Sequence, residues 1–90
     1  MTREEIQSAA AAVCSLLTDL GFIYETSADN RAKKKSVYVY VRRPVYTEIR
    51  ISDHATKKNR RKRFDIGPHG KPIDLALKEI SDWAKDIRHS

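Results

Sequence analysis

Apolar residues near both ends of the chain recur at steps of three and four residues, the spacing of one face of an α-helix. The first stripe follows Thr2 and Glu5, whose T-x-x-E spacing is that of a capping box at a helix start. The second follows Pro72, which suits the first turn of a helix. The pattern predicts one helix up to about Leu20 and another from Ile73 onward. The two stripes consist of Ile6, Ala9, Ala10, Val13, Leu16, Leu17 and Leu20, and of Ile73, Ala76, Leu77, Ile80, Trp83, Ala84 and Ile87.

The middle of the chain changes to a two-residue period, which is typical of half-buried β-strands. In residues 36–42 valines alternate with polar and aromatic residues, and residues 45–52 repeat the alternation after a turn at Arg43-Pro44. The two runs therefore predict a hairpin. One face of it carries Val37, Val39, Val41, Ile49 and Ile51, and the other carries Tyr38, Tyr40, Arg42, Tyr46, Glu48 and Arg50.

Two shorter β-prone runs, residues 22–26 and 63–66, flank the hairpin, and the polar segment 27–35 is predicted to be a turn or mobile loop. The order is then helix, three or four antiparallel strands, helix. We expect an α+β fold, a two-layer sandwich in which both helices cover the valine face and leave the Tyr/Arg face open. Residues 1–90 fit a single domain, with a basic loop at about residues 53–62.

Positive charge is concentrated in the middle of the chain. The formal net charge is +6, yet residues 31–63 alone sum to +11, while residues 1–30 sum to −4 and residues 64–90 to −1. A local positive field of this kind favours a polyanionic partner such as nucleic acid, and less often an acidic protein or a membrane surface.

Six cations in seven residues form the densest part of this region. Such a run favours contacts with phosphates, which bind tightly at low salt and read little base sequence. The alternative is a solvated loop that keeps the protein soluble. The cations are Lys57, Lys58, Arg60, Arg61, Lys62 and Arg63.

The predicted open sheet face offers a second surface. Rings of Tyr38 and Tyr40 suit stacking on the bases of a single strand, and guanidinium groups of Arg42 and Arg50 suit its backbone. The same residues also fit a structural role, because tyrosines pack against cross-strand neighbours and Arg50 has acidic residues nearby in sequence for pairing, Glu48 and Asp53. Tyr and Arg are also common in protein interfaces.

Catalytic chemistry has weaker support. Asp53-His54 ends the predicted hairpin, and His69 precedes the second helix. The carboxylate and the two imidazoles can form a catalytic group only if the fold brings these two segments together. A turn in which Asp53 caps backbone amides is the simpler reading. We expect no catalytic site, no metal site and no cofactor. The single cysteine, Cys14, lies on the first helix and is expected to pack as a small hydrophobe, as is Trp83 on the second.

The helix-sheet-helix order resembles two αβββα groups, the double-stranded-RNA-binding domains and the HicA-type mRNA interferases. HicA-type toxins place a catalytic His in a Gly-Ser-His signature at an early strand, whereas this chain reads Lys34-Lys35-Ser36 there, which argues against RNA cleavage. Double-stranded-RNA-binding domains begin their last helix with a Lys-Lys-x-Ala-Lys cluster. This chain has Gly70-Lys71-Pro72 instead and carries its cations before the last strand.

The pattern Ser36-x-Tyr38 followed by Ile49-Arg50-Ile51-Ser52-Asp53-His54 is also similar to small uncharacterised proteins of phages and mobile elements. That resemblance implies no particular activity. It raises the hypothesis of a compact phage-encoded inhibitor, for example an anti-CRISPR or other anti-defence protein, that acts on a host nucleoprotein complex.

The sequence therefore favours a non-enzymatic nucleic-acid-binding accessory protein, with RNA or DNA as partner. The alternative is the anti-defence inhibitor, which binds a protein or ribonucleoprotein complex, and the third hypothesis is a small HicA-like RNase or DNase that uses His54 or His69. No apolar stretch is long enough to span a bilayer and no signal-like start is present, so we expect a cytoplasmic protein without membrane contact.

Overall fold

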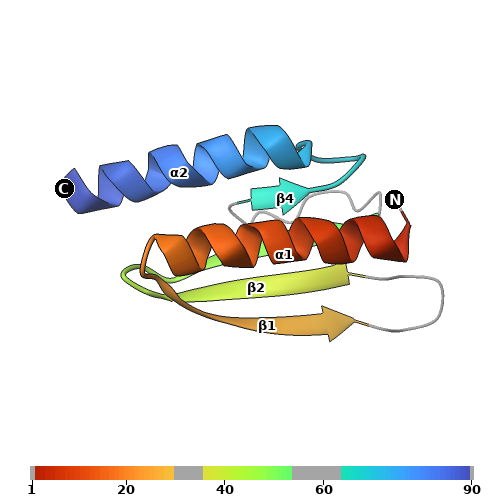
Figure 1. The fold of residues 1–90 in the computed structure, drawn as a ribbon, viewed down its shortest axis with the longest axis horizontal. Coiled ribbons are helices and arrows are strands. Elements are labelled where there is room, and N and C mark those ends of the chain that lie inside the picture. Colours follow the sequence, from red (N-terminus) through yellow and green to blue (C-terminus); the bar gives the residue numbers. More distant parts are fainter. Residues whose placement is uncertain (1, 30–35, 54–63, 90) are drawn as a thin grey trace.

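Two helices and four strands make up the fold of the computed structural model, which describes residues 2–29, 36–53 and 64–89. Along the chain, the elements follow the order helix, four strands, helix (Figure 1). The elements are α1 (Arg3–Asp19), β1 (Ile23–Asp29), β2 (Ser36–Arg43), β3 (Thr47–Ser52), β4 (Phe64–Ile66) and α2 (Ile73–His89).

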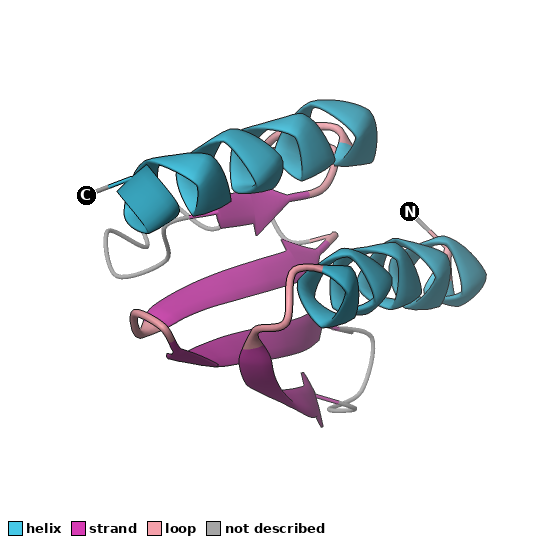
Figure 2. Cartoon of the chain, turned by 60° about the vertical axis from the view of Figure 1, so that its left-hand side comes forward, coloured by secondary structure: helices cyan, strands magenta, loops and turns pink. Residues whose placement is uncertain are grey.

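Both helices lie over the same face of the sheet, as Figure 2 shows. The buried apolar residues of the helices and strands form one core between the two layers. On the strands this core includes Val39, Val41, Ile49 and Ile51, the residues that the two-residue period places on one face. The predicted α+β fold and two-layer arrangement are therefore confirmed.

The sheet has the order β1-β2-β3-β4, and its directions are mixed. The predicted hairpin is confirmed, because β2 and β3 are antiparallel with Val39 opposite Ile49. Our expectation that all strands are antiparallel is wrong for β4, which runs parallel to β3 with Arg50 opposite Asp65. Parallel neighbours need a long connection rather than a tight turn. Residues 53–63 separate β3 from β4 in the sequence and are long enough for a wide connection. Their composition does not indicate whether the strand that follows runs parallel or antiparallel.

Strand β1 is longer than its predicted range of residues 22–26. It ends at Asp29, and Ser27 pairs with Tyr38 of β2. The polar residues after Thr26 have low strand propensity, yet hydrogen bonding to a neighbouring strand outweighs that preference. The prediction of a loop over residues 27–35 is thus wrong for its first three residues, and residues 30–35 lie outside the described part of the chain.

The predicted start and end of α1 are both confirmed. The Thr2 hydroxyl accepts a hydrogen bond from the Glu5 amide, and the Glu5 carboxylate accepts one from the Thr2 amide, each at 3.1 Å. After the helix, Gly21 adopts a φ of 76°, a left-handed conformation that favours glycine. The Arg88 guanidinium of α2 donates to the Leu20 carbonyl and so ties the two helix ends together.

Aromatic contacts join the sheet to α2. Trp83 is buried and meets the rings of Phe22 and Phe64 edge-on, each at a centroid distance of 5.8 Å. Such T-shaped pairs add to the hydrophobic stabilisation from burial. The predicted core role of Trp83 is confirmed.

Across the described ranges, neither α1 nor α2 is long and apolar enough to cross a membrane.

Candidate functional site on the open sheet face

The side of the sheet away from the helices is hereafter the open face. The strand registers place Tyr38 and Tyr40 of β2 there, opposite Arg50 and Glu48 of β3. They also add acidic residues from the two outer strands, among them Glu25 of β1 opposite Tyr40 and Asp65 of β4 opposite Arg50. The open face therefore includes Glu25, Tyr38, Tyr40, Arg42, Glu48, Arg50 and Asp65, together with Ser36 and Ser52, which lie opposite each other on β2 and β3 and are both buried.

Tyr38 and Tyr40 form a ring pair at the centre of the open face. Alternate residues of a strand point to the same side, so the two rings stand next to each other along β2. Their centroids are 6.3 Å apart and their planes differ by 11°. Both side chains are half-buried. The two near-parallel rings therefore form one aromatic pair on this face.

Arg42 extends this row toward the turn between β2 and β3. Its guanidinium lies 5.9 Å from the ring centroid of Tyr40 and 5.5 Å from that of Tyr46, and it donates to the Glu25 carboxylate at 2.9 Å. That carboxylate raises the pKa of Arg42 and keeps it charged. The Tyr46 hydroxyl donates to Glu48 at 3.0 Å, and this hydrogen bond raises the pKa of the phenol.

Arg50 lies on the open face as predicted, but it is not an exposed cation. Only 5% of its surface is accessible, and its Nε and Nη2 donate to the two oxygens of Asp65, each at 3.1 Å. Its partner is therefore neither Glu48 nor Asp53, the two residues that nearness in sequence suggested. Because the bidentate pair engages the guanidinium, the predicted contact of Arg50 with a nucleic-acid backbone is not supported by its position.

Sequence reasoning missed the acidic residues of this face. Asp65 stands between the core residues Phe64 and Ile66, so the two-residue period alone places it opposite the core. Glu25 had no comparable signal, because β1 carries few apolar residues. Together with Glu48, they set at least three carboxylates against Arg42 and Arg50, so the described residues of the open face carry no excess of positive charge.

The remaining predicted site residues divide into two groups. The basic run Lys57, Lys58, Arg60, Arg61, Lys62 and Arg63 lies outside the described residues, and so does His54. His69 is exposed in the turn before α2, and Asp53 is exposed at the end of β3. Among the described residues, no cluster of three or more His, Cys, Asp or Glu side chains is suited to hold a metal ion.

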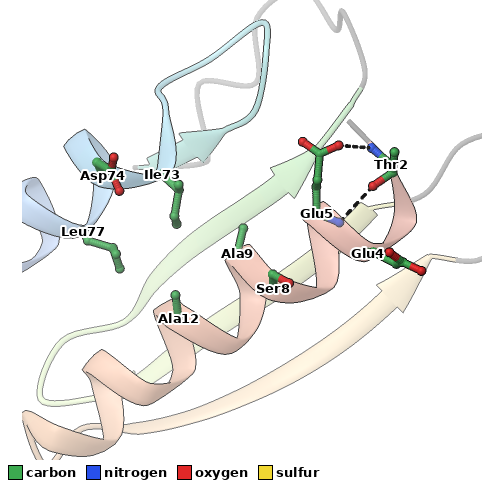
Figure 3. A pocket seen from close by; sticks show the side chains of 9 residues that line it. All are labelled: Thr2, Glu4, Glu5, Ser8, Ala9, Ala12, Ile73, Asp74 and Leu77. Atoms are coloured by element: carbon green, nitrogen blue, oxygen red, sulfur yellow. Dashed lines mark hydrogen bonds between the residues drawn. The ribbon is translucent and has the colours of Figure 1, made fainter.

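A hollow of about 690 Å³ lies on the helical side, between α1 and α2. Figure 3 shows Ala9 and Ala12 on one side of it and Ile73 and Leu77 on the other. Acidic residues stand at its rim: Glu4, Glu5 and Asp74. Negative charge repels phosphate, so this hollow is a poor site for nucleic acid, and the open face is the better candidate.

No protein-family model matches this chain, and comparison with curated proteins and with solved structures gave no match.

Proposed function

We propose that this protein binds single-stranded nucleic acid without cleaving it, stacking bases on Tyr38 and Tyr40 and holding phosphates with the basic run of residues 57–63. The observation that carries the proposal is the near-parallel ring pair on a sheet face that neither α1 nor α2 covers. Every base has an aromatic face, so such a pair accepts RNA or DNA with little sequence preference.

The charges of the open face support a division of roles. Arg42 is paired with Glu25, and Arg50 with Asp65. Phosphate contacts by these two cations would compete with the carboxylates that already hold them. The electrostatic part of binding is therefore assigned to the six cations of the run, and the open face contributes stacking.

Titration of labelled single strands across a salt series tests this proposal. We expect Tyr38→Ala and Tyr40→Ala each to weaken binding by about 1–3 kcal/mol, the usual value of one stacked base. We expect Arg60→Gln with Arg61→Gln to lower the slope of log affinity against log salt, because fewer counterions are released.

A matched control removes the same charge elsewhere. Lys78 and Lys85 are exposed on α2, so Lys78→Gln with Lys85→Gln lowers the net charge equally but leaves the run intact. This control is expected to keep most of the salt slope. Negligible binding of any single strand at low salt would refute the proposal, as would equal losses in the two double variants.

A protein partner is the second candidate, and one observation favours it. Three large apolar side chains near the turn between β2 and β3 are exposed: Ile23 at 61%, Val45 at 49% and Tyr46 at 53%. Ile23 also lines a hollow of about 510 Å³ with Pro44 and Ile87. An inhibitor of a host ribonucleoprotein complex would use such a surface. Binding to a purified complex but not to its free RNA, with loss in Val45→Asp, would favour this candidate.

A further inference from the structure

The two edges of the sheet differ in how their backbone groups are used. At the β4 edge, the chain folds back on itself: the Lys71 amide donates to the Asp65 carbonyl at 2.8 Å, and the Gly67 amide donates to the Lys71 carbonyl at 3.0 Å. The contact is tight, since a Cβ on Gly70 would lie 2.2 Å from the Asp65 carbonyl oxygen. This segment covers the β4 edge.

The β1 edge has no such cover within the described ranges. There, β1 pairs only with β2, and no described segment forms backbone hydrogen bonds with its outer side. Glu25, Thr26 and Ser27 are all exposed. An edge strand of this kind presents unpaired amides and carbonyls, which is a template for another strand.

The sequence of β1 lacks most features that prevent edge pairing. It contains no proline and no lysine, and its single irregularity, between Ile23 and Tyr24, lies at its very start. Natural edge strands are protected by charged side chains, lysine above all, and by proline, bulges or short length. Of these, β1 has, beyond the irregularity at its start, only its two acidic residues, Glu25 and Asp29. From Tyr24 to Asp29, β1 is regular and long enough to pair.

Strand length and charge together favour one register for the self-pairing of β1. Residues opposite each other in a sheet point to the same side, so a symmetric antiparallel pair must be centred on a residue. Thr26 is the middle residue of β1, and centring on it pairs the whole strand with its copy. It also sets Glu25 opposite Ser27 of the second copy. Centring on Glu25 would instead set two carboxylates opposite each other, which is unfavourable.

We infer that β1 is a dimerisation edge, pairing antiparallel with β1 of a second copy about Thr26. The result is a continuous eight-stranded sheet. Because the two-fold axis is perpendicular to the sheet, the open faces of both copies lie on the same side and form one surface. This inference does not depend on nucleic-acid binding and is tested without it.

Sedimentation velocity of the purified chain, from about 1 µM to about 1 mM, measures the dimer directly over the range expected for a small interface. Thr26→Lys sets two ammonium groups opposite each other at the axis, so we expect at least a tenfold weaker dimer. Ser27→Lys adds the same charge one residue away but places it opposite Glu25 of the second copy. That dimer is expected to be as tight or tighter. Circular dichroism checks that both variants remain folded.

Cysteine cross-linking tests the register in a Cys14→Ser background. Opposite residues of antiparallel strands have Cα atoms about 4.5–5.5 Å apart, within the range of a disulfide. Thr26→Cys is therefore expected to form a covalent dimer on mild oxidation, and Ser27→Cys to form far less. A chain that stays monomeric throughout, a dimer that tolerates Thr26→Lys, a dimer lost equally in both lysine variants, or equal cross-linking at the two positions would overturn the inference.

Discussion

Arg50 and Asp65 lie opposite each other on the parallel strands β3 and β4, and two hydrogen bonds of 3.1 Å join guanidinium to carboxylate. β4 is only three residues long, so its ladder with β3 is short. A side-chain pair across the same two strands reinforces that ladder. The pair also keeps the Arg50 guanidinium engaged and therefore unavailable to a ligand.

Loss of the Asp65 charge is expected to destabilise the fold. Asp65→Asn leaves the buried Arg50 guanidinium without its counter-charge, and we expect a loss of about 1–3 kcal/mol in the free energy of unfolding. Urea unfolding measures it. Glu25→Gln is the control, because its pair with Arg42 is exposed and is expected to be worth under about 1 kcal/mol. Equal losses in the two variants would contradict the structural role given to Arg50.

The capping box of α1 is expected to make stability depend on pH in the acid range. Hydrogen bonds from the Thr2 amide and hydroxyl hold the pKa of Glu5 below its usual value. A lowered pKa means that the ionised carboxylate stabilises the folded state above about pH 4.3, the ordinary value for Glu. This contribution is lost as the pH falls through the lowered pKa.

Glu5→Gln tests that contribution, because glutamine keeps the hydrogen-bonding shape without the charge. We expect the wild-type chain to be the more stable at pH 7 and the difference to shrink toward pH 3, as followed by thermal unfolding. Glu4→Gln removes a charge from the same turn without touching Thr2, and its effect is expected to be smaller. A difference for Glu5→Gln that stays constant with pH would argue against an ionised capping carboxylate.

Cys14 is expected to react slowly with alkylating reagents. Its side chain is half-buried against the core, and this burial raises the pKa of the thiol, which outweighs the opposite effect of a hydrogen bond with Tyr24. The thiolate is the reactive species. At pH 8 we expect alkylation to be about tenfold slower than for an exposed thiol. Ser15→Cys in a Cys14→Ser background supplies that comparison on the next residue, which is exposed. Equal rates would contradict this packing of Cys14.

The elements with strong periodicity could be predicted from sequence, and the reason is physical. The α1 cap, the two helical stripes and the valine alternation of β2 each follow from interactions between residues close in sequence. The parallel direction of β4 could not be found in this way, because it depends on how the chain returns to the sheet. The extent of β1 depends in the same way on its pairing with β2.

The candidate site shows the same limit at the level of single residues. Alternation correctly placed Tyr38, Tyr40 and Arg50 on one face. It did not indicate that Arg50 meets Asp65, since the two residues are 15 positions apart and become neighbours only through the parallel pairing. To predict whether the Arg50 guanidinium is accessible, one therefore needs the order of the strands as well as the two-residue period.

The burial of Trp83 in the core separates two fluorescent groups of the molecule, the tryptophan and the tyrosine pair. The single tryptophan lies in the core between the layers, and the tyrosine pair lies on the opposite side of the sheet. Selectively excited tryptophan emission will follow unfolding, while ligand stacking on the open face will first quench tyrosine emission. Tyr24 and Tyr46 also emit, so a change in tyrosine emission that persists in Tyr24→Phe with Tyr46→Phe signals occupancy of the open face, and a change in tryptophan emission signals a disturbed core.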